Sequence, residues 1–272
     1  MLLCIDVGNT ETKLGFFGAS ASGLGLEMVA PWRVSTVKHR TSDEFGVLLA
    51  ALFNEADIAL GAVRAIAISS VVPQSDRDLR DGCLRYFKTE PIWLRGKNQT
   101  VMEVRTERPT ELGADMLAAA IGARGKYGTP TIVIGYGTAT TFSAISRDGA
   151  FLGTAIAPGI QISIDALVAR TAKLPQVAFE APPSPIGRET VESLQSGLVY
   201  GFVAQTEGMI ARFKAELGPD AVVVATGGLA EIVAAHTAAI NAVDASLTLE
   251  GLKIFWNAAV PAVDGAGAGA IR

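Results

Sequence analysis

The chain has 272 residues, of which 49% are apolar and 18% are charged, and its formal net charge at neutral pH is −4. This composition excludes a disordered chain, and the length predicts two domains of ordinary size. Basic residues are scattered rather than clustered, so no nucleic-acid footprint is expected, and no apolar run approaches the ~18 residues of a membrane span. We expect a small-molecule partner, with neither nucleic acid nor membrane bound.

The first apolar stretch is interrupted at once by Asp6 and Gly8, a pattern that argues against a signal peptide. Cys4 and Cys83 have neither metal-ligand spacing nor the pattern of a secreted disulfide framework. A cytoplasmic location is therefore expected.

The first half of the chain is predicted to alternate strands and helices. Its predicted strands cover residues 1–7, 13–17, 32–37, 63–72 and 91–94, with a loop or hairpin end at 18–27. Its predicted helices cover residues 41–60, with Ser42 or Asp43 as the cap, and residues 74–87.

The opening pattern of strand, Gly-Thr turn and strand then recurs half a chain later. Strands are predicted over residues 131–134, 142–145 and 222–225, and helices over 111–127, 160–171, 190–217 and 229–235. The tail after Ala259, rich in Ala and Gly, is expected to be poorly ordered. The recurrence predicts a duplicated α/β architecture rather than a single Rossmann sheet, with domains at residues 1–115 and 116–272.

Three glycine turns follow apolar strands in this pattern. In the first, Asp6 ends a strand and can hold Mg²⁺, while the turn 8–10 offers backbone N–H groups to phosphate oxygens. The other two turns lie at residues 137–141 and 226–228. Ordinary hairpin chemistry accounts equally well for any one of the turns, but three together favour nucleotide binding.

Two such hairpins and a late Gly-Gly turn resemble the superfamily of actin, hexokinase and acetate kinase. In that superfamily, two related ribonuclease H-like domains bind ATP in the cleft between them. Over nearly its whole length the chain more narrowly resembles a type III pantothenate kinase. The segments that carry this resemblance are DVGNT at 6–10, SSVVP at 69–73, PTELGAD at 109–115, GTATT at 137–141, APGI at 157–160, IGRETVESLQSGLVYG at 186–201, TGGLA at 226–230 and LTLEGL at 247–252.

The resemblance implies phosphorylation of pantothenate by ATP, the first step of coenzyme A synthesis, in a homodimer. It makes Asp115 the general base, because attack of a primary alcohol on phosphorus needs a proton acceptor, and it assigns Mg²⁺ to Asp6. The implied nucleotide-binding residues are Asp6, Val7, Gly8, Asn9, Thr10, Glu11, Thr12, Lys13, Thr138, Thr226, Gly227 and Gly228. The implied pantothenate-binding residues are Gly113, Ala114, Asp115, Met116 and Thr190, the last from the other subunit or the far side of the cleft.

The chain departs from the family pattern at three positions of the site. Met116 follows the presumed base where the family has an arginine, so a charge-assisted hydrogen-bond donor is absent. Gly135 and Ser143 stand where the family has aspartates, the first of which is a ligand for a monovalent cation. A K⁺ or NH₄⁺ site is therefore expected to be lost or rebuilt.

These departures leave three hypotheses open. One is an active pantothenate kinase with altered metal dependence. Another is a catalytically impaired homologue that binds nucleotide or pantothenate and acts as a regulatory protein. The third is a kinase for another small alcohol, which would explain a changed substrate anchor beside a retained base. The retained Asp6, Asp115 and Thr190 favour a kinase.

Overall fold

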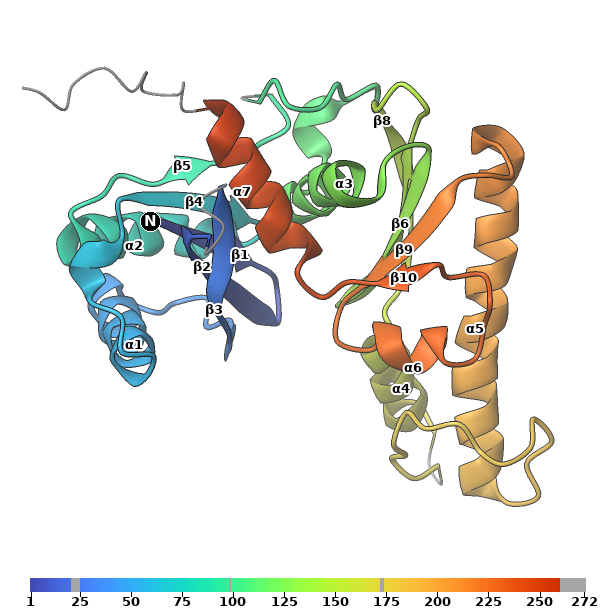
Figure 1. Ribbon diagram of the computed structural model, residues 1–272. Coiled ribbons are helices and arrows are strands. Elements are labelled where there is room, and N and C mark those ends of the chain that lie inside the picture. Colours follow the sequence, from blue (N-terminus) through green and yellow to red (C-terminus); the bar gives the residue numbers. More distant parts are fainter. Residues whose placement is uncertain (21–24, 98, 172–173, 260–272) are drawn as a thin grey trace, which may run out of the picture.

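The computed structural model describes residues 1–20, 25–97, 99–171 and 174–259, and these form two five-stranded sheets with flanking helices (Figure 1). The first sheet has the strand order β3-β2-β1-β4-β5 and the second the order β8-β7-β6-β9-β10. In both, the first two strands form an antiparallel hairpin, and the fourth pairs in parallel with the first. The predicted duplicated α/β architecture is confirmed.

The strands are short, and each half contributes one sheet. The first sheet contains β1 (Leu2–Val7), β2 (Glu11–Ala19), β3 (Leu26–Ser35), β4 (Ala65–Ser70) and β5 (Ile92–Trp93). The second contains β6 (Thr131–Tyr136), β7 (Ala139–Ile145), β8 (Phe151–Pro158), β9 (Val222–Thr226) and β10 (Ala242–Val243).

The helices follow the strands in the same order in both halves, with two helices of the second half in the place of the first helix of the first. They are α1 (Ser42–Glu55), α2 (Pro73–Gly82), α3 (Ala114–Tyr127), α4 (Ile160–Ala169), α5 (Thr190–Leu217), α6 (Ala230–Ala234) and α7 (Leu247–Ala259). Short 3₁₀ turns lie at Leu60–Ala62 and Pro109–Glu111, and a π-helical turn at Cys83–Phe87 extends α2. The predicted boundary between residues 115 and 116 falls inside α3, the last element of the first repeat, and stays a prediction.

The cap of α1 differs from the prediction of Ser42 or Asp43. Thr41 caps the helix, because its hydroxyl accepts a hydrogen bond from the Glu44 N–H at 3.3 Å while the Glu44 carboxylate accepts one from the Thr41 N–H at 2.9 Å. This reciprocal pair is a capping box, which requires Ser or Thr three residues before Glu.

Several predicted bounds were wrong. The strand predicted at 32–37 is β3, which begins at Leu26 and passes through Pro31; an edge strand tolerates proline because one side of its backbone makes no ladder. The helix predicted from residue 111 starts at Ala114, after a 3₁₀ turn. The strands β8 and β10 and the helix α7 were not predicted. The prediction for the tail after Ala259 lies outside the residues that the structure describes.

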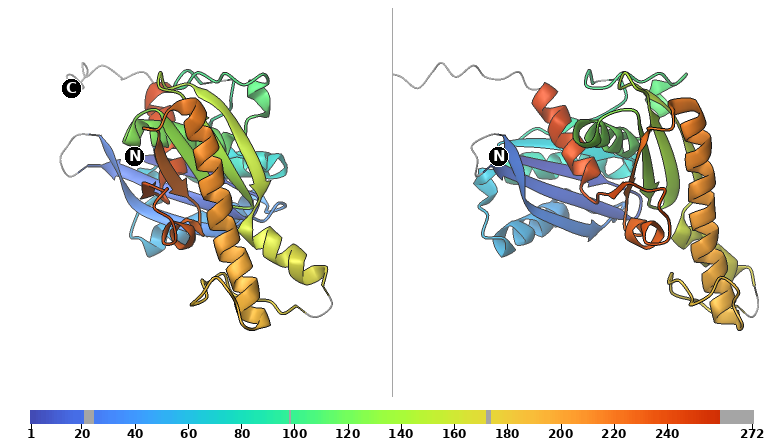
Figure 2. Two further views of the ribbon diagram at one scale, coloured as in Figure 1. Left: turned by 90° about the vertical axis from the view of Figure 1, so that its right-hand side faces the viewer. Right: turned by 45° about the vertical axis from the view of Figure 1, so that its right-hand side comes forward.

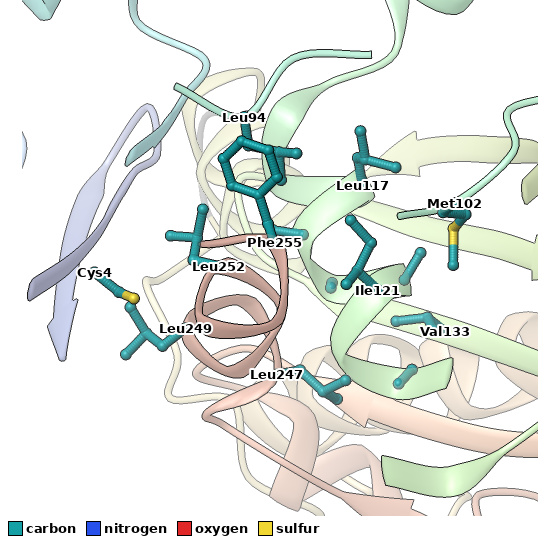
Figure 3. Packing of buried hydrophobic residues seen from close by; sticks show 14 of the residues in the cluster. Cys4, Leu94, Met102, Leu117, Ile121, Val133, Leu247, Leu249, Leu252 and Phe255 are labelled. Carbon is teal, nitrogen blue, oxygen red and sulfur yellow. The ribbon is translucent and has the colours of Figure 1, made fainter. Parts of the chain in front are cut away.

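Helices α3 and α7 lie side by side between the two sheets (Figures 1 and 2). Figure 3 shows Leu249 and Phe255 of α7 between Cys4 of β1 and Leu117 of α3, all of them buried. Because α7 contacts both β1 and α3, the last described helix ties the C-terminal part of the chain to the first sheet.

Glycines allow α3 and α7 to approach with their backbones in contact. A Cβ atom added at Gly251 would lie 1.8 Å from the Ala118 carbonyl oxygen, and one at Gly122 would lie 2.2 Å from the Leu247 carbonyl oxygen. Only glycine fits at such a crossing. The contact fixes the position of α3, whose first turn carries Asp115.

Candidate active site

Asp6 is the last residue but one of β1 and is buried, with 5% of its surface exposed. The parallel register of β1 and β4 sets it beside Ser69, whose hydroxyl donates to Asp6 Oδ1 at 2.7 Å. Lys13 is its partner in the register with β2. The Thr248 hydroxyl, in the first turn of α7, lies close enough to lower the pKa of Asp6 but makes no hydrogen bond of ordinary geometry.

Burial raises the pKa of Asp6 to about 6, and the nearby charge of Asp115 adds to that rise. The hydrogen bond from Ser69 and the charge of Lys13 act in the opposite direction. Burial destabilises the ionised form of this carboxylate, and a bound cation would stabilise that form again. Asp6 is therefore suited to bind a cation.

The turn after Asp6 is tight. The Gly8 N–H donates to the Glu11 carbonyl at 3.0 Å, and a Cβ atom at Gly8 would lie 2.9 Å from that oxygen. Asn9 and Thr10 at its tip are exposed. The tip of the turn is therefore open to solvent, and its predicted role in binding phosphate stays a prediction.

The second hairpin carries a turn of the same kind at Gly137 and Thr138. A Cβ atom at Gly159, which begins α4, would lie 2.2 Å from the Thr138 carbonyl oxygen, and one at Gly227 would lie 2.3 Å from the Tyr136 carbonyl oxygen. Gly227 also has φ of +105°, which other residues rarely adopt. Three glycine segments of the second half thus meet at the end of β6.

The two hairpin turns touch across the junction of the two sheets. The hydroxyls of Thr10 and Thr138, 128 residues apart, share a hydrogen bond at 2.9 Å. Arg33 of β3 pairs with Glu11 at 2.8 Å, and a Cβ atom at Gly228 would lie 3.6 Å from the Arg33 guanidinium. The predicted nucleotide-binding turns therefore lie together, as a phosphate site between two domains requires.

Asp115 lies in the first turn of α3 and faces the same junction. Its Oδ1 accepts a hydrogen bond from the Met116 N–H at 2.8 Å. Burial raises the pKa of Asp115, while backbone N–H groups and the charge of Lys13 lower it. Because its charge acts on Asp6, the two carboxylates belong to one site.

Not every predicted site residue offers its side chain. Val7 and Ala114 are buried in the core, with 3% and 6% of their surfaces exposed. Thr12 is also buried, and its hydroxyl shares a hydrogen bond with that of Thr36 at 2.8 Å. The Thr226 hydroxyl is buried without a hydrogen-bond partner. Val7, Ala114 and Thr12 can contribute backbone groups only, whereas Thr226 has a free hydroxyl.

Thr190 is the predicted site residue that the single chain does not bring to Asp115. It begins α5 at the end remote from α3 (Figures 1 and 2). There it lines an open cavity of about 450 Å³ with Arg188 and Ser193 among its other residues.

Gly135 has no side chain to hold a cation, and a side chain at this position would meet the Thr141 hydroxyl. A Cβ atom at Gly135 would lie 2.7 Å from the Thr141 hydroxyl oxygen, its partner on β7. The residues present do not fit a monovalent-cation site at this position.

Within the described ranges, no group of three His, Cys, Asp or Glu residues is arranged to hold a metal ion. Mg²⁺ needs fewer protein ligands, because one or two carboxylates with phosphates and water suffice, and Asp6 fits that role.

Sequence reasoning missed three residues of the site: Ser69, Thr154 and Thr248. Ser69 reaches Asp6 through strand register, and Thr248 reaches it through the packing of α7. Thr154 lies on β8, with its hydroxyl 3.9 Å from Met116 Sδ. Ser69 and Thr248 lie within the quoted motifs at 69–73 and 247–252, the available signal for them.

Comparison with known proteins points to one family. The family model described as "Type III pantothenate kinase" matches residues 2–212. The chain is 43% identical over 258 residues to a type III pantothenate kinase from Acidobacterium capsulatum, covering 95% of each chain. It is 46% identical over 256 residues to one from Myxococcus xanthus, covering 94% of this chain and 98% of the relative.

Solved structures show the same fold at low sequence identity. The activator of the 2-hydroxyisocaproyl-CoA dehydratase from Clostridium difficile aligns with a TM-score of 0.53 at 13% identity, covering 94% of this chain and 93% of that one. Component A of the (R)-2-hydroxyglutaryl-CoA dehydratase from Acidaminococcus fermentans gives 0.51 at 15% identity, covering 94% and 96%. The predicted actin-like fold is confirmed.

Across the part of the chain with described structure, no helix has the length and apolar character that crossing a membrane requires.

Proposed function

The chain belongs to the type III pantothenate kinase family, and from that premise we propose that it transfers the γ-phosphoryl group of ATP to the primary hydroxyl of pantothenate. This reaction opens coenzyme A synthesis. The observation that carries the proposal is the meeting of Asp6, Asp115 and the two Gly-Thr turns at one junction. An impaired homologue would not need to keep both carboxylates and both turns.

Asp115 is the group proposed to accept the proton. As the substrate hydroxyl oxygen attacks the γ-phosphorus, the bond from phosphorus to the β-γ bridging oxygen breaks and ADP leaves. The hydroxyl proton passes to the Asp115 carboxylate, whose raised pKa makes it a better base than an exposed aspartate.

The phosphates are proposed to lie between the turns at 8–10 and 137–138, whose backbone N–H groups and Thr hydroxyls can donate to them. Asp6 would hold Mg²⁺, which when bound neutralises negative charge on the phosphates. Lys13, whose charge acts on both carboxylates, adds positive charge to the site. Because Gly135 supplies no ligand, we propose that turnover does not depend on K⁺ or NH₄⁺.

A homodimer is proposed because Thr190 lies away from Asp115 within one chain, so a second chain would have to bring it there. Exposed apolar side chains lie on β8, on α4 and around the start of α5, and exposed apolar surface favours association. They are Ile156, Ile162, Leu167, Ile186 and Val191, exposed to 63%, 46%, 38%, 78% and 39%. Light scattering should give twice the monomer mass. An Ile186→Asp/Val191→Asp variant should be monomeric, with a lower kcat/KM for pantothenate; a fully active monomer would argue against the shared site.

We also propose a cytoplasmic location, which the free and buried thiols of Cys4 and Cys83 support.

The test of the function is a coupled ADP-release assay with Mg-ATP and pantothenate, with and without K⁺ or NH₄⁺. We expect pantothenate-dependent turnover with K⁺, with NH₄⁺ and without either cation, and a loss of about 10²–10⁴-fold in Asp115→Asn. ADP release that does not depend on pantothenate, or that continues at the same rate in Asp115→Asn, would contradict the assignment. Calorimetric binding without turnover would instead favour a binding homologue.

A further inference from the structure

A row of polar side chains crosses the first sheet on the face that lies toward the second half of the chain. The strand register aligns one residue from each of four neighbouring strands: Ser69, Asp6, Lys13 and Arg33. Residues that stand opposite one another in a sheet point to the same face. Cys4, on that face of β1, packs in the core that contains α3 and α7. Arg33 therefore extends the row that holds Asp6 and Lys13 by one strand, to the edge of the sheet.

The guanidinium of Arg33 lies between two of the three glycine turns. Its Nε donates to Glu11 Oε1 at 2.9 Å, and its Nη2 lies 2.8 Å from the same oxygen. A Cβ atom added at Gly228 would lie 3.6 Å from that Nη2, which is an ordinary contact distance. Glu11 follows the first turn and Gly228 belongs to the third. Arg33 thus stands where the two halves of the chain meet around the proposed nucleotide site.

The pair with Glu11 leaves part of the guanidinium available. A guanidinium carries more N–H donors than one carboxylate oxygen can accept, and among the described residues Glu11 is the hydrogen-bond partner of Arg33. The Arg33 side chain is 64% exposed, and an exposed ion pair contributes little to stability. A planar cation with donors to spare is suited to phosphate oxygens, which it can bind through two parallel hydrogen bonds.

The charge of Glu11 raises a second mechanism. Glu11 belongs to the segment proposed to bind the phosphates of ATP, and its carboxylate would repel them unless a cation stood beside it. Arg33 supplies that cation, so it could aid binding by neutralising Glu11 alone. The contact of Nη2 with Gly228, in the turn of the second half, favours direct binding in addition.

We propose that Arg33 is a further nucleotide-binding residue, which donates hydrogen bonds to the phosphates that stay on ADP after transfer. Neighbouring strands lie about 4.8 Å apart, so the backbone of Arg33, two strands from Asp6, is roughly 10 Å from the proposed Mg²⁺ ligand. The γ-phosphate would lie at Asp115, where the acceptor loses its proton, so the outlying Arg33 meets the other phosphates. This inference rests on the proposed function, since it concerns the nucleotide of the same transfer.

Binding of Mg-ADP to the purified full-length protein, measured by calorimetry, tests the inference without requiring turnover. Arg33→Gln should raise the Kd of Mg-ADP by about tenfold, because it removes a charge-assisted hydrogen bond. The Kd of adenosine, which has no phosphate, should stay unchanged. In the ADP-release assay the same variant should raise the KM for ATP by a similar factor and keep kcat within about twofold, as expected for a contact made equally before and during transfer.

Arg85→Gln is the matched control. Arg85 is 63% exposed and pairs with Asp43 at 2.5 Å, so this variant removes the same charge from an equally exposed ion pair. Arg85 lies in the π-helical turn that packs against the other face of the first sheet, and its loss should leave the Kd of Mg-ADP unchanged. Arg33→Lys, which keeps the charge without the planar fork, should give an intermediate Kd and replaces Arg33→Gln if that variant does not fold.

Glu11→Gln provides the background that separates the two mechanisms. If Arg33 binds phosphate directly, the tenfold loss from Arg33→Gln persists in that background. If Arg33 only neutralises Glu11, the loss disappears, because no carboxylate remains to be neutralised, and the inference is overturned.

Two further outcomes would overturn the inference: an unchanged Kd of Mg-ADP in Arg33→Gln, and an equal loss for adenosine and Mg-ADP, which would place Arg33 at the nucleoside. Both leave the proposed function intact, because pantothenate-dependent ADP release is measured separately. An unmodified protein that binds no Mg-ADP would contradict the proposed function and this inference together.

Discussion

Asp6 and Asp115 share one site, and burial raises the pKa of both, that of Asp6 to about 6. The proposed base must be ionised to accept a proton, and the proposed metal ligand must be ionised to bind Mg²⁺. We therefore expect kcat/KM to fall as pH drops below about 6, by about tenfold per pH unit once one group limits the reaction. The profile is measured from pH 5 to 8, with circular dichroism at each pH to verify folding. A flat profile down to pH 5 would contradict the assignment.

The buried charge of Asp6 should also reduce stability at neutral pH. Because its folded pKa of about 6 lies above the usual aspartate value of 3.8, the folded state binds the proton more tightly than the unfolded state does. Its contribution is favourable at low pH and is lost as pH rises through about 6. The difference between the two pKa values corresponds to a loss of at most about 3 kcal/mol in the free energy of unfolding.

Asp6→Asn should therefore raise the free energy of unfolding at pH 8 by about 2 kcal/mol while abolishing turnover. The amide oxygen can still accept the hydrogen bond from Ser69, so packing is preserved. Urea unfolding at pH 8 and pH 4.5 provides the measurement, and the gain should shrink at the lower pH. Asp165→Asn, at an exposed position on α4, is the control and should change stability by less than about 0.5 kcal/mol. If Asp6→Asn instead has a lower free energy of unfolding than the unmodified protein at pH 8, the charge of Asp6 does not destabilise the folded state.

At the scale of elements, the crossing of α3 and α7 is the contact most sensitive to a single methyl group. A Cβ atom at Gly251 would lie 1.8 Å from the Ala118 carbonyl oxygen, which is backbone and cannot move aside. We expect Gly251→Ala to lower the free energy of unfolding by about 3 kcal/mol. Gly208→Ala on α5 is the matched control, since its Cβ would meet only the end of the Arg212 side chain at 3.4 Å. It should be neutral or stabilising by up to about 1 kcal/mol. Equal urea midpoints for the two variants would contradict the close crossing.

The same glycine explains why α7 escaped prediction from the sequence. A glycine inside a run of apolar residues predicts a break, but here Gly251 permits the contact with Ala118. Strand β8 was missed for another reason: its exposed face carries Leu152 and Ile156, so apolar and polar residues do not alternate. The hairpins were predicted correctly because their signal, an apolar strand followed by a glycine turn, is local.

For the site, local motifs predicted that Asp6, Thr10 and Thr138 carry polar groups at strand ends. Their meeting across the two halves followed only from family resemblance, and Ser69 and Thr248 depend on register and helix packing, which one sequence does not encode locally.

At the scale of the whole molecule, α7 joins the two halves, because it belongs to the second repeat but contacts β1 and α3. We therefore expect the halves to unfold in one cooperative transition. The tryptophans provide a test, since Trp32 and Trp93 pack in the first half and Trp256 lies on α7. Their fluorescence reports one side of the molecule. Far-UV circular dichroism includes the 28-residue helix α5, which belongs to the other side.

Ile210, on α5, is 3% exposed and packs in the core of the second sheet. Ile210→Ala should destabilise the protein by about 2–5 kcal/mol. If the halves are coupled, tryptophan fluorescence and circular dichroism must show the same lowered urea midpoint, although no tryptophan lies in that core. Leu252→Ala, in α7 and fully buried, removes packing at the coupling helix itself. A fluorescence midpoint that stays unchanged in Ile210→Ala while the circular dichroism midpoint falls would mean that the halves fold independently. The contact of Thr10 with Thr138 would then need ligand to hold it, since no shared core would keep the two turns together.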